Sequence, residues 1–125
     1  MKVRTSELMG AALDWAVAMC EDMLDQTWPD GPVAFFNSVR VGGGFHYSTD
    51  LSQAGPIIDR ERITLDARES DWQARIWNRA TCDFIEVGRR GAYCTTALIA
   101  AMRCRVASKL GDEVEVPDEL MENNE

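Results

Sequence analysis

The segment TTALIAAMRCRVASKLG, residues 95–111, decides the fold expected for this chain. Its large apolar residues recur at helical spacing and form one stripe: Leu98, Ile99, Met102, Val106 and Leu110. Thr95 or Thr96 is suited to cap the start of the helix, and Gly111 is suited to end it. The alanines at positions 97, 100, 101 and 107 leave room for a sheet or a second helix to approach closely. The segment therefore predicts a long C-terminal helix packed against another layer.

A second long helix is expected near the N-terminus, capped by Thr5 or Ser6. Its apolar positions recur at spacings of four, three, four and four: Leu8, Ala12, Trp15, Met19 and Met23. We expect this stripe to be buried, with the acidic residues, Asp14 among them, largely on other faces. The segment TWPDGP, residues 27–32, should end the helix, because prolines cannot continue it and Asp-Gly favours a turn.

The middle of the chain predicts strands. Residues 33–36 and 38–41 are expected to be short strands that end at the glycine run 42–44. Residues 72, 74 and 76 are apolar and alternate with Gln73, Arg75 and Trp77, which is the pattern of a strand. Residues 82–87 should form the next strand, paired antiparallel with the first.

These elements predict an α+β fold. A small antiparallel sheet of about three to four strands is packed with long N-terminal and C-terminal helices and a short kinked middle helix. Residues 1–120 are expected to form one domain, and residues 121–125 a disordered acidic tail.

The charge balance bears on the class of partner. The chain of 125 residues has a formal net charge of −8, which argues against direct binding of nucleic acid, whose phosphates demand a basic face. It permits an acidic surface that docks on a basic partner, and mimicry of DNA by carboxylates stays open as an extension.

Four cysteines could suggest disulfides, but no secretory signal or membrane-spanning stretch is expected in this sequence. We therefore expect free thiols, with Cys20 and Cys104 among the small apolar residues of helices. There is no C-x-x-C pair, and His46 is remote in sequence from every cysteine. Neither a metal site nor a cofactor is expected.

The stretch GGGFHYSTDLSQAGPIIDRER, residues 42–62, is the main candidate for a functional site. Its glycines could expose amides to an anion, yet the spacing matches neither phosphate-binding glycine motif, so a structural loop is favoured. Ser48, Thr49 and Asp50 are suited to cap a helix. The alternative is a Ser or Thr nucleophile served by His46 and Asp50. Pro56 should divide the following helix into two short pieces with a kink between them.

A binding site is easier to support than a catalytic one. Arg75 and Trp77 should share the non-core face of their strand, which is unusual unless a helix or a partner covers that face. Arg89 and Arg90, at a turn, are most simply solvated charges. We assign no catalytic residue, and the candidate binding residues are His46, Tyr47, Ser48, Thr49, Asp50, Trp77, Arg89 and Arg90.

Three segments also carry a family resemblance. KVRTSELMGAALDWAVA, YSTDLSQAGPIIDRERI and LIAAMRCRVASKLGDEVEVPDEL resemble the NinX family of small bacteriophage proteins, and more distantly the phage ABA sandwich domain. The chain departs from the family pattern at Leu51, where a tryptophan is frequent, and at Ala54, where a glycine is usual. The resemblance implies a fold, a phage origin and a location in the host cytoplasm, but no catalytic residues.

Three hypotheses about function follow. The first is a non-enzymatic phage accessory protein that binds a host or phage protein during infection. The second is sequestration of a small phosphorylated ligand or nucleotide signal used in host defence, with residues 47–50, Arg89 and Arg90 around it. The third, less favoured, is a small hydrolase that uses His46. A homodimer is also possible for a protein of this size.

Overall fold

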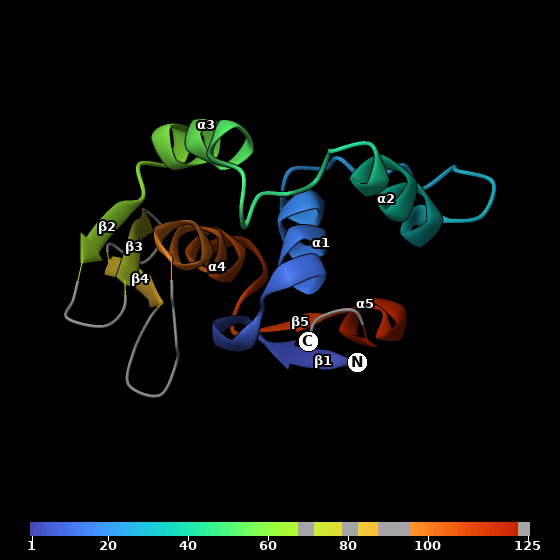
Figure 1. Cartoon of the computed structure of the whole chain (residues 1–125). Helices are drawn as coiled ribbons and strands as arrows, with labels where there is room; N and C mark the ends of the chain where they lie inside the picture. The colour runs from blue at the N-terminus through green and yellow to red at the C-terminus, as the bar shows by residue number, and fades with distance from the viewer. Residues whose placement is uncertain (68–71, 79–82, 88–95, 123–125) are drawn as a thin grey trace.

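The computed structural model of the protein describes residues 1–67, 72–78, 83–87 and 96–122, and at positions 77, 78, 83–87, 121 and 122 it describes the backbone alone. The fold is α+β, as predicted. Two antiparallel sheets lie in the described residues, a two-stranded one of order β1-β5 and a three-stranded one of order β2-β3-β4. The three-stranded sheet forms one end of the molecule, and α4 separates it from α1 (Figure 1).

Helix α4 (Ala97–Leu110) is the central element that the sequence predicts. Thr96 caps it, because its hydroxyl accepts a hydrogen bond from the Ile99 amide at 3.1 Å, and the helix ends before Gly111. Its small buried residues, Ala100 and Ala101, allow it to pack on all three strands of the larger sheet and on α1. This arrangement confirms the predicted role of the C-terminal helix.

The cap of α4 leads to a first prediction. We expect Thr96→Ala to lower the free energy of unfolding by about 1 kcal/mol, because the Ile99 amide loses its side-chain acceptor. Thr96→Ser keeps the hydroxyl and should retain most of the stability. Urea denaturation of both variants checks this, and equal losses in the two would contradict the capping role.

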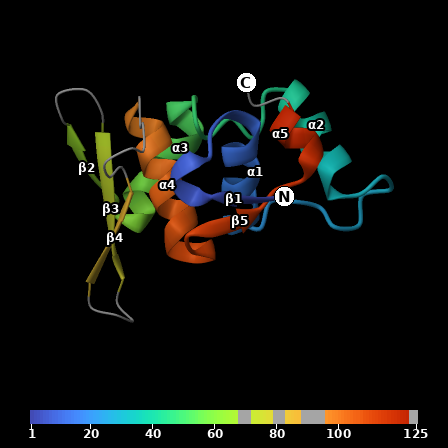
Figure 2. The same cartoon turned by 90° about the horizontal axis from the view of Figure 1, so that it is seen from below.

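The larger sheet consists of β2 (Thr64–Ala67), β3 (Trp72–Asn78) and β4 (Asp83–Val87). The predicted antiparallel pairing of the last two is confirmed by the register, in which Ile76 is opposite Ile85. Ala74 and Ile76 are buried, as the alternation predicted. Figure 2 shows this sheet as an outer layer with α4 on one side and no described helix on the other.

The smaller sheet was not predicted from the sequence. β1 (Lys2–Arg4) pairs with β5 (Glu113–Glu115), so the two ends of the described chain lie together (Figure 1). Val3 opposes Val114, and both are buried, whereas the flanking residues are charged and exposed. Strands of three residues give too short an alternation to be recognised in a sequence. After β5, helix α5 (Asp118–Glu122) buries Leu120 in the core.

The N-terminal helix is shorter than predicted. Thr5–Glu7 form a 3₁₀ turn, η1, and α1 runs over Gly10–Cys20. Every residue from 11 to 18 is buried, so this helix is enclosed on all sides and lacks the polar face that was predicted. The prediction of a five-residue buried stripe is wrong at its end, because Met19 and Met23 are among the exposed large apolar residues.

The predicted strands at 33–36 and 38–41 are wrong, since α2 is a helix over Pro32–Val41. Pro32 occupies its first turn, where a missing amide hydrogen and a preset φ favour a helix start. Phe36 and Arg40, four residues apart on one face, both contact α1 residues. The glycine run at 42–44 therefore ends a helix rather than strands.

Helix α3 (Leu51–Glu61) is one continuous helix, which corrects the prediction of two pieces. Pro56 lies inside it and lacks the amide that would donate one turn back. The C-terminal end of α3 is tied to α1 and α4 by an ion-pair network. Arg60 contacts Glu21 at 2.8 Å, and Arg105 lies between Glu21 and Glu61 at 3.1 and 3.4 Å.

Cys20 and Cys104 are buried free thiols, as predicted. Burial raises the pKa of the Cys20 thiol to about 11, so it is protonated at neutral pH and unreactive as a nucleophile. Cys82 and Cys94 lie outside the described residues.

Candidate functional site

The loop that joins α2 to α3, residues 42–50, holds five of the eight candidate residues. His46 is bonded on two sides: Nε2 lies 3.0 Å from the Arg40 carbonyl oxygen, and its amide donates to Gln53 Oε1 at 2.7 Å. A carbonyl oxygen only accepts, so Nε2 carries the hydrogen in this contact. One ring nitrogen of His46 is thus engaged with the backbone of α2.

Ser48 is buried and joined to a carboxylate on α1. Its amide donates to Asp14 Oδ1 at 2.8 Å, and the other oxygen of Asp14 receives Arg40 Nη2 at 3.0 Å. Burial raises the pKa of Asp14, while the hydrogen bonds from Ser48 and the charge of Arg40 lower it, so burial dominates. This buried polar cluster (Asp14, Arg40 and Ser48) connects α1, α2 and the loop.

Asp50 caps α3, as the sequence predicted for the run 48–50. Its Oδ1 accepts from the Ser52 amide at 2.9 Å and from the Ser52 hydroxyl at 2.6 Å. These bonds lower the pKa of Asp50, which keeps the capping carboxylate ionised at neutral pH. Thr49 lies beside it, exposed, with its hydroxyl 3.5 Å from the His46 carbonyl oxygen.

Tyr47 belongs to an aromatic cluster beneath the loop. Phe45 lies with its ring centroid 6.3 Å from that of Tyr47 and stacks on Phe36 at 5.4 Å. The φ of Phe45 is +58°, a left-handed conformation that is costly for a bulky residue. Packing against Phe36 supports this conformation, and burial raises the pKa of the Tyr47 hydroxyl. The two rings therefore face the core.

The glycine run makes a turn held from α3. Gly43 has a φ of +99°, and its carbonyl accepts from Gln53 Nε2 at 3.0 Å. A Cβ at Gly44 would collide with a methyl group of Val39, so a larger residue there would require α2 or the loop to shift. These contacts give the run a structural role, and ligand binding by residues 46–50 stays a prediction.

The side chains of the other three candidates lie outside the described part of the structure. Trp77 lies in β3 opposite Phe84 in the register, but its side chain is outside the described part of the structure. Arg89 and Arg90 also lie outside the described residues. Arg75, two residues before Trp77, is half-buried and contacts Asp66 at 3.1 Å.

A second exposed feature was not predicted from the sequence: the segment 21–31 that joins α1 to α2, called here the α1–α2 connection. Figure 1 shows it extending from the end of α1 to the edge of the molecule. It carries two exposed large apolar side chains, Met23 at 53% and Trp28 at 38% exposure. Met23 is exposed because α1 ends at Cys20. Its exposure was not predicted, because the helical spacing of apolar residues was extended past that end to Met23.

The α1–α2 connection has defined turns. Asp22 is left-handed with a φ of +55°, and the Met23 amide bonds back to the Ala18 carbonyl at 3.0 Å, which ends α1. Asp25 Oδ1 accepts from the Thr27 amide and hydroxyl at 2.8 and 2.7 Å. The ring of Trp28 meets that of Phe35 edge-on at 5.3 Å. The backbone at Met23 and the ring of Trp28 are therefore held in place.

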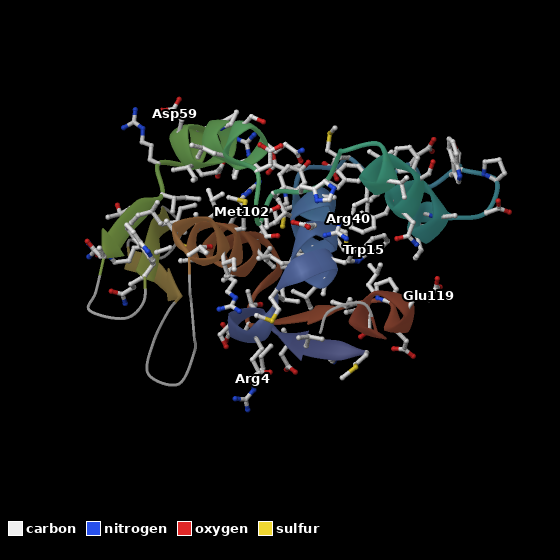
Figure 3. All side chains as sticks on the ribbon, in the orientation of Figure 1. Arg4, Trp15, Arg40, Asp59, Met102 and Glu119 are labelled. Carbon is white, nitrogen blue, oxygen red and sulfur yellow. The ribbon has the colours of Figure 1, made fainter. Side chains whose placement is uncertain are left out.

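Figure 3 shows the labelled side chains Trp15 and Arg40 near each other, in the region where α1 meets α2. Trp15 is buried against Phe36, with ring centroids 5.5 Å apart. Together with the ion pair of Arg40 and Asp14, this contact holds the two helices that flank the connection. The arrangement provides a rigid base for an exposed segment.

In the described part of the chain, no helix is both long and apolar enough to cross a membrane. In the same ranges, no three His, Cys, Asp or Glu side chains gather as metal ligands would.

Comparison with curated proteins gives no match. A family model does match, and its description is "Bacteriophage P22, NinX". The match covers residues 4–109, which includes α1, α2, α3, the three-stranded sheet and nearly all of α4. Since this is most of the chain, the protein belongs to the bacteriophage P22 NinX family.

Proposed function

We propose that this phage protein is a non-enzymatic accessory protein that acts by binding a host or phage protein, and that the α1–α2 connection is its docking surface. The observation that carries the proposal is the exposure of Trp28 and Met23 on a segment with defined turns. Tryptophan is enriched at the energetic centres of protein interfaces, and methionine adapts to irregular surfaces.

The exposed side chains of Trp28 and Met23 do not belong to the hydrophobic core. The core contains Trp15 and Phe36, which are buried against each other, and Leu24 of the connection packs partly against that core. Trp28 lies outside this core, and its ring meets that of Phe35 edge-on. A large apolar side chain held in this way offers one face to a partner.

Preorganisation supports the same proposal. A flexible segment loses conformational entropy when it binds, whereas one with a fixed turn loses less. The Asp25–Thr27 bonds and the bond from the Gly31 amide to the Trp28 carbonyl at 2.9 Å fix the backbone on both sides of Trp28. The connection therefore has the features of a surface that binds without refolding.

The proposal predicts the result of a capture experiment from phage-infected cells. A Met23→Ser/Trp28→Ala variant should lose most of any partner that the wild-type protein enriches, because the apolar contact area is removed. Leu51→Ser is the matched control, since Leu51 is 65% exposed but lies at the start of α3. The measurement is quantitative mass spectrometry of the captured proteins.

Two capture results distinguish the possibilities. Loss in the Met23/Trp28 variant with retention in Leu51→Ser supports docking at the connection. Retention of the partner by all variants would contradict it, because the partner would then bind elsewhere. Circular dichroism of each variant confirms that the fold is intact.

A further inference from the structure

The α1–α2 connection is acidic as well as apolar. From residue 21 to residue 39 the chain has no lysine, arginine or histidine and has four acids: Glu21, Asp22, Asp25 and Asp30. Glu21 is paired with Arg60 and Arg105. Within the described residues, none of the three remaining acids takes part in an ion pair. The connection therefore presents three carboxylates that no cation among the described residues pairs with.

One of these carboxylates, that of Asp25, accepts two hydrogen bonds from Thr27. The hydroxyl and amide of Thr27 lower the pKa of Asp25 further below its usual value, because both bonds favour the ionised form. Asp22 and Asp30 are exposed to solvent. Nearby Arg40 does not offset them, since its guanidinium is paired with Asp14.

Acid and apolar groups alternate along the segment in the order Asp22, Met23, Asp25, Trp28, Asp30. The two exposed apolar groups are thus flanked by negative charge on both sides. A partner that buries Trp28 brings its own residues beside these carboxylates, and acidic residues there would be repelled. Phosphate groups of nucleic acid or of anionic lipid would be repelled in the same way.

We propose that the α1–α2 connection docks a basic amphipathic segment of the partner protein, with an apolar side chain on Trp28 and Met23 and lysine or arginine residues against Asp22, Asp25 and Asp30. This inference rests on the proposed function and specifies the chemistry of its partner. The net charge of −8 on the whole protein favours the approach of such a segment over distance, and the connection determines where it is held.

The test uses two synthetic helical peptides of the same length. Both have leucine on one face, and the other positions are all lysine in one peptide and all glutamate in the other. Fluorescence anisotropy of each labelled peptide with the full-length protein should show binding of the lysine peptide only. The affinity should fall as salt is raised, since exposed charges are screened over about 8 Å at physiological ionic strength.

Two triple variants separate local from general charge. Asp22→Asn/Asp25→Asn/Asp30→Asn should weaken binding of the lysine peptide roughly tenfold, as three lost contacts would. Glu7→Gln/Asp59→Asn/Glu113→Gln removes the same charge at exposed sites on η1, α3 and β5, and should change the affinity less than twofold. Equal weakening by the two triples would overturn the inference, because net charge alone would then explain binding.

The inference about a basic partner can be wrong while the proposed function is right. If Met23→Ser/Trp28→Ala loses its partner from infected cells but the two peptides bind equally, the connection docks a protein whose segment is not basic. If the variant keeps its partner, the proposed function is wrong whatever the peptides do. Binding of the lysine peptide that is weakened about tenfold in the aspartate triple, is also weakened in Trp28→Ala, and changes less than twofold in the control triple supports both.

Discussion

The substitution Asp14→Ala is expected to lower the free energy of unfolding by about 3 kcal/mol. Asp14 is fully buried, and its two oxygens accept from the Ser48 amide at 2.8 Å and from Arg40 Nη2 at 3.0 Å. Alanine leaves a buried amide without an acceptor and a guanidinium without its counter-charge. Arg40 is about a third exposed and can turn toward water, which places the loss at the lower end for a broken buried pair.

The measurement is urea denaturation at pH 7, with Asp14→Asn as the control. Asparagine keeps an acceptor for the Ser48 amide and removes only the charge, so it should destabilise the protein less than alanine does. If alanine costs less than about 1 kcal/mol, the buried polar cluster does not hold the loop on α1.

The pH dependence of the same pair provides a second check. Burial raises the pKa of Asp14 in the folded protein above its ordinary value of 3.8, so the native state binds this proton more tightly than the unfolded chain. The contribution of Asp14 to stability is then greatest below pH 4 and falls as the pH rises through the native pKa. The stability of the wild type relative to Asp14→Asn should decline over that range. A relative stability that increases with pH would mean that Arg40 and Ser48 outweigh burial.

Phe36→Ala should be equally severe, with an expected loss of about 3–4 kcal/mol in the free energy of unfolding. Phe36 is fully buried, stacks on Phe45 at 5.4 Å and meets Trp15 edge-on at 5.5 Å. Its removal leaves a cavity between α1 and α2 and removes the packing that supports the left-handed φ of Phe45.

Phe36→Leu is the matched variant, since it keeps most of the apolar volume and should cost less than about 1.5 kcal/mol. Thermal and chemical denaturation of both variants give the comparison. A small loss in Phe36→Ala would show that α2 and the loop are held chiefly by the polar cluster.

The sequence predicted the helices around the core better than it predicted their exposed ends. The helix at 97–110, its Thr96 cap and the antiparallel pairing of β3 with β4 follow directly from periodicity and spacing. α2 was missed because Val33, Phe35 and Phe36 have strand-like preferences, and contacts with α1 outweigh such preferences. The two three-residue strands were too short to leave a pattern.

In the candidate site, too, one feature was predicted from the sequence and another was not. The cap formed by Asp50 was predictable because a side-chain oxygen before a helix satisfies a local amide. Asp14 was assigned to a polar face, although its neighbours Ala11, Ala12 and Ala16 are all small and apolar. A helix that is apolar around its whole circumference is buried, so an acid within it must have buried partners. That signal was available in the sequence.

The exposure of Met23, in contrast, could not be predicted from the sequence. Four-residue spacing continues from Trp15 through Met19 to Met23, yet α1 ends at Cys20 with a left-handed Asp22. Aspartate in this position is less recognisable than glycine as a helix end. The α1–α2 connection therefore becomes visible only in three dimensions.

Docking at the connection is tested most directly by a photo-crosslinking side chain introduced in place of Trp28, with the same group at Leu51 as reference. In phage-infected cells, we expect position 28 to form one dominant covalent adduct with a protein partner, and position 51 to form it at background level. No adduct at position 28, or equal adducts at both positions, would contradict the proposal that this exposed segment is the surface by which the protein acts.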